Sequence, residues 1–188
     1  MIRLALATAV LALAACHAGG SQGEAPAPSA SVISIGVQLG TCSDKAQCEA
    51  ECDAGSADRC RRLAASYAFG DGVPKDEARA TGLYEKACDL DDAPACVFAG
   101  QMHEYAHGVP KDDAAATALY TRACTAGWAG GCYNQAIMLE NGRGVPRDLV
   151  KAAALYDAAC KSGAKLACSR AGAIRASLAD GGAAGPDR

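Results

Sequence analysis

The chain has 188 residues and a formal net charge of −3, with 18 basic and 21 acidic side chains scattered along it. This distribution forms no basic patch, so we expect no nucleic-acid partner. Aromatic residues make up only 5% of the chain, which is thin for one large core but enough for a stack of repeats that bury their apolar faces against one another. Eleven cysteines indicate an oxidising compartment, because cytosolic thiols are kept reduced.

Residues 1–15 are predicted to be a secretory signal peptide. A short basic start, Met1-Ile2-Arg3, is followed by an uncharged apolar run that is too short to span a bilayer. The run ends in Leu13-Ala14-Ala15-Cys16, which resembles the signal of bacterial lipoproteins. The resemblance implies that Cys16 is lipidated and becomes the new N-terminus. The alternative is an ordinary signal peptide that is cut near Ala18, with the loss of Cys16.

The segment after Cys16 bears on localisation. His17 follows the cysteine, and by resemblance to the sorting rule of Gram-negative lipoproteins this implies the outer membrane, facing the periplasm. We therefore expect a lipid-anchored protein of the bacterial cell envelope, or a secreted one if Cys16 is not lipidated. Residues 16–40 are rich in Gly, Ser, Ala and Pro without helical periodicity, so we expect a lipidated N-terminus followed by a flexible linker.

Cysteines recur in pairs that are eight residues apart, and successive pairs are 36 residues apart. The pairs are Cys52/Cys60, Cys88/Cys96, Cys124/Cys132 and Cys160/Cys168. A fixed period of this size is typical of stacked helical repeats. Three full units begin near the second cysteine of the first three pairs, and apolar residues at helical spacing predict a first helix of about ten residues in each.

Each first helix is expected to end at the same break, at residues 70–76, 106–112 and 142–148. The break has the form Gly-x-Gly-Val-Pro-Lys/Arg-Asp, with Ala106 replacing the first Gly in the second copy. Gly supplies left-handed backbone, Pro cannot continue a helix, and Asp can cap the next one. The second helices carry the pairs Leu83-Tyr84, Leu119-Tyr120 and Leu155-Tyr156. We expect these tyrosines to be buried core residues with hydrogen-bonded hydroxyls, and not catalytic residues.

The break, the Leu-Tyr pair, the Ala three residues after it and the flanking cysteines resemble the Sel-one-like repeat family. These proteins are relatives of tetratricopeptide repeats, and the likeness is strongest to the secreted cysteine-rich branch. The resemblance covers 41–178, as a partial leading unit, three full repeats and a trailing helix, with a disordered tail at 179–188. It implies an all-α solenoid, a superhelix of antiparallel helix pairs that binds a protein or peptide ligand; we expect a monomer without a cofactor.

The resemblance also implies that the four cysteine pairs are disulfides. The first cysteine of each pair ends one helix and the second opens the next, which is compatible with disulfide geometry. Closing so short a loop removes about 2.5 kcal/mol of unfolded-state entropy in the chain model. Cys42 and Cys48 remain, and we pair them with each other. A redox-active or metal-binding site at Cys48 and Cys52, four residues apart, is the alternative.

Two short motifs suggest other chemistry. His103-Glu104-Tyr105-Ala106-His107 matches the His-Glu-x-x-His string of zinc proteases, but His107 lies at the helix break and no later histidine provides a third ligand. Metal binding at His103 and His107 is therefore a secondary hypothesis, and we expect no dedicated metal site. Ser162-Gly163-Ala164-Lys165 matches the Ser-x-x-Lys of penicillin-interacting enzymes, without their companion motifs.

Activity toward β-lactams has been attributed to the cysteine-rich branch. A weak β-lactam-hydrolysing, penicillin-binding or peptidoglycan-modifying hydrolase is therefore the runner-up, and our main expectation is a protein without catalytic residues.

Partner contacts are expected where the repeat template does not dictate the residue. One register position on successive first helices holds Arg62, Phe98, Asn134 and Arg170. In the family this position lies on the inner, concave face, commonly as Asn, so only Asn134 matches it directly. Met102 and Met138 are predicted to join this partner-binding surface, next to the variable positions Phe69 and Tyr105.

Overall fold

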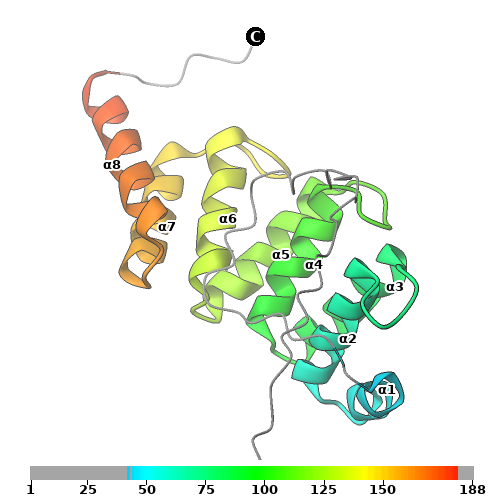
Figure 1. Cartoon of the computed structure of the whole chain (residues 1–188). Coiled ribbons are helices and arrows are strands. Elements are labelled where there is room, and N and C mark those ends of the chain that lie inside the picture. The colour runs from blue at the N-terminus through cyan, green and yellow to red at the C-terminus, as the bar shows by residue number, and fades with distance from the viewer. Residues whose placement is uncertain (1–41, 43, 182–188) are drawn as a thin grey trace, which may run out of the picture. The chain divides into compact units, whose positions relative to one another are not determined.

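The computed structural model describes residue 42 and residues 44–181, and this part of the chain is all helical. The predicted signal peptide, Cys16 and the linker lie outside the described residues. Helices follow one another in chain order (Figure 1). They are α1 (Lys45–Asp53), α2 (Ala57–Phe69), α3 (Glu77–Asp89), α4 (Ala93–Glu104), α5 (Asp113–Thr125), α6 (Ala129–Asn141), α7 (Leu149–Lys161) and α8 (Lys165–Ala179).

The predicted α/α solenoid is confirmed. Each helix packs mainly against the next one along the chain, and α4 also contacts α6 across the intervening helix. The first helices of the three full repeats are α2, α4 and α6, and they begin three residues before the predicted cysteines. The trailing helix α8 also starts earlier than expected and extends one residue into the segment predicted as a disordered tail.

Aspartate caps start the second helices as predicted. The side chains of Asp76, Asp112 and Asp148 accept hydrogen bonds from backbone amides two or three residues later, at 2.8–2.9 Å. A side-chain cap of this kind satisfies amide protons that have no partner within the helix. The break between helices thus fixes where the second helix of each repeat begins.

The glycine before Val-Pro has a packing role that the pattern alone did not reveal. Gly108 and Gly144 have φ values of +70° and +67°, and an added Cβ would collide with backbone atoms of the preceding second helix. The collision would involve Glu77 and Ala78 for Gly108, and Asp113 and Ala114 for Gly144. The second and third breaks therefore rest on the start of the previous repeat's second helix, which couples these neighbouring repeats.

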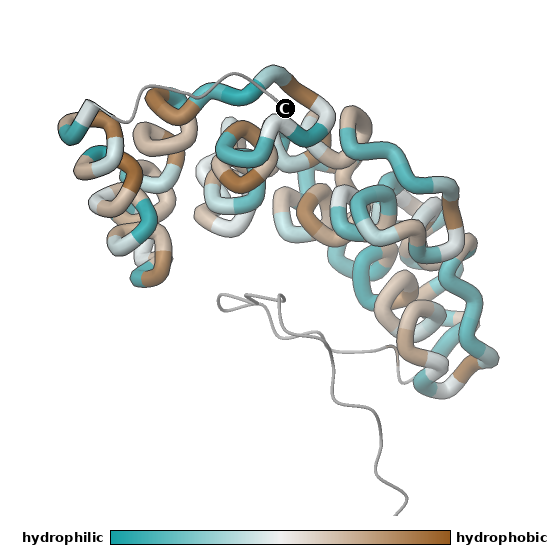
Figure 2. Tube along the Cα trace, turned by 90° about the horizontal axis from the view of Figure 1, so that it is seen from above, coloured by the Kyte–Doolittle hydropathy of each residue, from teal (hydrophilic) through white to brown (hydrophobic). Residues whose placement is uncertain are grey.

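The core consists of small side chains and buried tyrosines. Tyr84, Tyr120 and Tyr156 are buried among alanines, so their predicted core role is confirmed. Hydrophilic and hydrophobic segments alternate along the helices (Figure 2). Among the described residues, no helix is long and apolar enough to cross a membrane.

Five disulfides join the cysteines of the described region. They pair Cys42–Cys48, Cys52–Cys60, Cys88–Cys96, Cys124–Cys132 and Cys160–Cys168. The four bridges at the repeat junctions have Cα–Cα distances of 4.4–4.9 Å, because the second-helix end and the next first helix cross at a tight turn. With Cys48 and Cys52 in separate bridges, this structure holds no free thiol pair at that position.

Candidate functional site

The register position predicted to contact a partner lies on four helices. Arg62 on α2 is half-buried, and its Nε donates to Asp58 at 2.7 Å. Phe98 on α4 is half-buried, with its ring centroid 5.2 Å from that of Tyr84. Asn134 on α6 is also half-buried. These three side chains keep part of their surface available to a ligand.

The fourth member of the series, Arg170 on α8, is exposed. Its Nη1 lies 3.3 Å from Oε1 of Glu140, which links α8 to the end of α6. The charge of Arg170 is thus paired within the chain, but more than half of its side chain stays in solvent.

The two methionines do not belong to this surface. Met138 is fully buried in the cluster that contains Tyr120 and the Cys88–Cys96 bridge, and Met102 is 8% exposed in the cluster that contains Tyr84. The prediction that they contact a partner is wrong for the folded chain. They lie four residues beyond Phe98 and Asn134 on the same helices, but they are buried in the clusters that contain Tyr84 of α3 and Tyr120 of α5.

Two aromatic side chains stand in solvent beside the predicted positions. Phe69 is 67% exposed and Tyr105 is 50% exposed, and they occupy the same register position 36 residues apart. Each follows a member of the predicted series, Arg62 or Phe98, by seven residues. Residues seven apart lie on the same side of a helix, since seven residues make almost two turns. We define the first-helix surface as Arg62, Phe69, Phe98, Tyr105, Asn134 and Arg170.

A buried polar network lies next to this surface. The Tyr120 hydroxyl donates to Oε2 of Glu104 at 2.6 Å, and Arg143 from the following break donates to Oε1 of the same carboxylate. The Tyr156 hydroxyl makes the equivalent bond to Glu140 at 2.7 Å. The pattern of the repeats did not predict this role for either glutamate, although both lie 16 residues before the tyrosine that they bind.

The pKa values of these tyrosines are raised in the folded chain. Burial raises the pKa of Tyr120 and Tyr156 above the ordinary value, and the adjacent Glu104 or Glu140 raises it further. Burial also raises the pKa of Tyr84, although no carboxylate bonds to its hydroxyl among the described residues. A phenol that resists ionisation keeps its proton, so the hydroxyls of Tyr120 and Tyr156 serve as hydrogen-bond donors in the core.

The two histidines of the zinc-protease string have different environments. Nε2 of His103 lies 2.7 Å from Glu85, whereas His107 lies beyond the end of α4, with Nδ1 3.6 Å from Glu77. The carboxylate of Glu104, the glutamate of the string, accepts a hydrogen bond from Tyr120 and pairs with Arg143. The described residues contain no group of three or more His, Cys, Asp or Glu side chains placed to hold a metal ion. The string therefore does not form the helical metal site that its letters suggest.

The Ser-x-x-Lys string spans a turn. Ser162 is the C-terminal cap of α7 and Lys165 is the first residue of α8, and both are exposed. An exposed serine at a helix end lacks the enclosed pocket in which such a nucleophile is activated.

Ion pairs that were not predicted from the sequence join successive second helices. Lys86 Nζ lies 2.8 Å from Asp53, and Arg122 Nη1 lies 2.8 Å from Asp89. In both pairs the cation follows the acid by 33 residues, so they repeat one contact in successive units. The sequence does show a basic residue 33 positions after an acidic one in both units, and this repetition could have predicted the ion pairs.

Comparison with known proteins identifies the family. The Sel1 repeat model matches residues 60–92, 93–128 and 129–163, which together exceed half of the chain. The chain belongs to the Sel1 repeat family. No curated protein matches it.

Solved structures show the same architecture. A Sel1 repeat protein from Oxalobacter formigenes is 27% identical, with a TM-score of 0.62 over 67% of this chain and 95% of that one. The protein c5321, a protective antigen of uropathogenic Escherichia coli, is 26% identical, with a TM-score of 0.69. That match covers 76% of this chain but only 30% of c5321. Helicobacter pylori cysteine rich protein B shares the fold at 23% identity and a TM-score of 0.54, over 66% of this chain and 89% of that one.

Proposed function

We propose that this Sel1 repeat protein is a lipid-anchored scaffold of the bacterial cell envelope that binds a polypeptide through its first-helix surface. Sel1 repeat proteins are generally scaffolds for protein–protein interaction. A solenoid suits this role because each repeat adds one strip of surface and a ligand contacts several strips in succession.

The observation that carries the proposal is the exposure of Phe69 and Tyr105. The tyrosines that the repeat template dictates are buried, whereas these two aromatics project into solvent from adjacent first helices. Large aromatic side chains are enriched in protein interfaces, where they supply much of the binding energy.

Charged groups on the same surface suit a polypeptide ligand. The Arg62 side chain is 37% exposed beside Asp58, and that of Arg170 is 56% exposed beside Glu140. Ion pairs in solvent contribute little to stability, so a ligand carboxylate can compete for either guanidinium at low cost. We expect the aromatics to provide affinity and the arginines to set orientation.

Site-specific photo-crosslinking tests the surface directly. A photoreactive phenylalanine analogue would replace Phe69 or Tyr105 in cells, with Val150 and Leu166 as matched control positions. The controls are 69% and 60% exposed apolar residues on α7 and α8, outside the first-helix surface. We expect a discrete polypeptide adduct from positions 69 and 105 and none from 150 and 166. Equal labelling from all four positions would refute the proposed surface.

The lipid anchor rests on the sequence Leu13-Ala14-Ala15-Cys16. Two or more acyl chains hold a protein stably on a membrane, whereas one chain is marginal. We expect metabolic labelling with a radioactive fatty acid to mark the wild type and to fail for Cys16→Ser, which should also leave the membrane fraction. Labelling that persists in Cys16→Ser would exclude this attachment site.

A further inference from the structure

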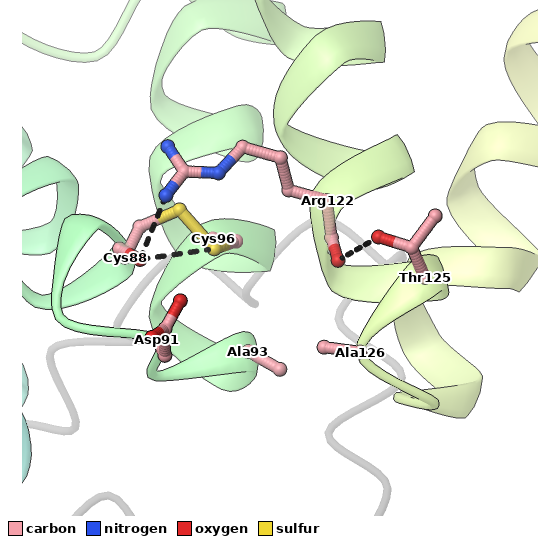
Figure 3. Close-up of a pocket in the computed structure, with 7 residues that line it drawn as sticks. All are labelled: Cys88, Asp91, Ala93, Cys96, Arg122, Thr125 and Ala126. Carbon is pink, nitrogen blue, oxygen red and sulfur yellow. Dashed lines mark hydrogen bonds between the residues drawn. A yellow bond between two sulfur atoms is a disulfide. The ribbon is translucent and has the colours of Figure 1, made fainter.

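A cavity of about 290 Å³ lies at the junction of two repeats, on the side where the Cys88–Cys96 turn faces the end of α5 (Figure 3). It is lined by Cys88, Asp91, Ala93, Cys96, Arg122, Thr125 and Ala126. This volume is at the small end for ligand pockets and fits one side chain better than a large cofactor. The cavity adjoins the start of α4, whereas Tyr105 of the first-helix surface follows the end of that helix.

Asp91 has an unusual backbone conformation at the edge of this cavity. Its φ is +63°, and the same register position holds Gly55, Gly127 and Gly163 in the other turns, all with positive φ. Aspartate tolerates this region better than most residues, but glycine adopts it without steric cost, so Asp91 departs from the residue that the turn favours. The second repeat thus has a carboxylate where the other copies have a glycine suited to the turn.

The charges around the cavity are unequally matched. Nη1 of Arg122 lies 2.8 Å from Asp89, and Nη2 donates to the carbonyl of Cys88 at 3.0 Å, so the guanidinium is already paired. The Asp91 carboxylate points toward the side of the cavity that holds the disulfide and Arg122 (Figure 3). Within residues 44–181, no hydrogen bond or ion pair reaches that carboxylate. Asp91 is exposed, so the lining presents one solvent-accessible carboxylate that no side chain of the described residues pairs with.

The remaining lining is mostly apolar. The Cys88–Cys96 disulfide and the methyl groups of Ala93 and Ala126 form walls without charge (Figure 3). Thr125 uses its hydroxyl to donate to the Arg122 carbonyl at 2.8 Å. A long basic side chain matches this arrangement, because its methylene stem covers apolar surface while its cationic end reaches a carboxylate.

We propose that this cavity binds a lysine or arginine side chain of a polypeptide, with Asp91 pairing with the cationic end. The site is separate from the first-helix surface and does not depend on the function proposed for that surface. Aspartate is then kept at position 91 because glycine, which this backbone conformation favours, would remove the unpaired carboxylate of the cavity.

Nuclear magnetic resonance titration of the full chain, with its disulfides formed, tests the charge. The probe is Nα-acetyl-lysine methylamide, and the counter-probes are the norleucine and glutamic acid analogues, which have a neutral or an acidic side chain. We expect the lysine probe to cause saturable shifts at the amides of Ala93, Thr125 and Ala126. Equal saturation by norleucine, or tighter binding of the glutamic acid probe, would overturn the proposal.

Two variants separate the charge from the backbone. Asp91→Asn keeps a side chain that tolerates positive φ, and we expect it to weaken binding of the lysine probe at least tenfold without lowering the Tm. Ala106→Gly is the matched control, because Ala106 is the other non-glycine residue with positive φ among the described residues and does not line the cavity. Ala106→Gly should bind like the wild type. Full binding by Asp91→Asn, or an equal loss in both variants, would contradict the role of Asp91.

Discussion

The second and third repeats contain the same tyrosine–glutamate pair in different surroundings. In the second repeat the Glu104 side chain is 7% exposed and bonds to Tyr120 and to Arg143, whose own side chain is 32% exposed. In the third repeat the Glu140 side chain is 20% exposed, and its arginine partner on α8 is 56% exposed. The second network is enclosed by a following repeat, whereas the third lies near the end of the array.

This difference shows that a repeat template specifies a contact but not its strength. The same hydrogen bond becomes more costly to break as water is excluded from its partners. The first repeat extends the comparison, since Ala68 occupies the glutamate position and Tyr84 has no carboxylate partner among the described residues.

The largest effect is expected from removing the enclosed carboxylate. Glu104→Ala leaves a buried tyrosine hydroxyl and Arg143 without their acceptor, so we expect a loss of about 3 kcal/mol in the free energy of unfolding. Glu140→Ala should cost only about 1 kcal/mol because water reaches its partners. Urea unfolding with the disulfides intact, followed by circular dichroism, measures both. Equal losses would mean that enclosure by the next repeat does not matter.

A smaller effect is expected from removing the hydroxyls. Tyr120→Phe should lower the free energy of unfolding by about 1.5 kcal/mol and Tyr156→Phe by about 1 kcal/mol, because each leaves a carboxylate with one donor fewer. Tyr84→Phe is the control and should change it by less than about 0.5 kcal/mol. The same urea measurement applies. A cost for Tyr84→Phe as large as that for Tyr120→Phe would remove the hydrogen bond as the explanation.

The same tyrosines should make the stability of the fold depend on pH in the alkaline range. Their pKa values are raised in the folded chain, so their contribution to stability is complete below the unfolded value of about 10 and is lost as the pH rises above it toward the folded values. We expect the urea midpoint to fall above this pH, less steeply in Tyr120→Phe than in the wild type. Absorbance of tyrosinate should rise together with unfolding for these residues. Their ionisation in the fully folded chain would contradict this assignment.

The smallest effect concerns the end of α4. Ala106 has a φ of +58°, whereas Gly70 and Gly142 hold the equivalent position in the first and third repeats. Ala106→Gly relieves this strain but increases the conformational entropy of the unfolded chain. We expect a net gain of about 0.5 kcal/mol in the free energy of unfolding. Gly142→Ala is the reciprocal variant and should lose about 1 kcal/mol. Thermal unfolding followed by circular dichroism compares them, and a loss in Ala106→Gly would show that Ala106 is not strained.

Sequence periodicity predicted the fold well because the repeat constraints are local. The aspartate caps act within one turn and the Leu-Tyr pairs follow helical spacing, so a 36-residue register suffices to place them. The trailing helix was predicted too short, because its first turn lies within the segment assigned to the cysteine turn.

The candidate site was harder to predict. Met102 and Met138 were expected at the surface, and the register alone could not show that these side chains pack against the preceding second helix. Glu104 and Arg143 are 39 residues apart. Asp91 stands where the other turns have glycine, but the sequence does not show that it keeps the positive φ of those glycines or lines a cavity. Such contacts depend on how repeats stack, which a single sequence does not encode in any local pattern.

The central claim is that the exposed aromatics of the first-helix surface bind a polypeptide. The most direct test starts from the partner that crosslinking identifies, purified on its own. Calorimetry then measures the affinity of this free partner for three forms of the protein. These are the wild type, the double variant Phe69→Ala/Tyr105→Ala and the matched control Val150→Ala/Leu166→Ala. Loss of two interface anchors should weaken binding at least about tenfold, while the control stays within about twofold of the wild type. Equal affinities for all three forms would contradict the claim.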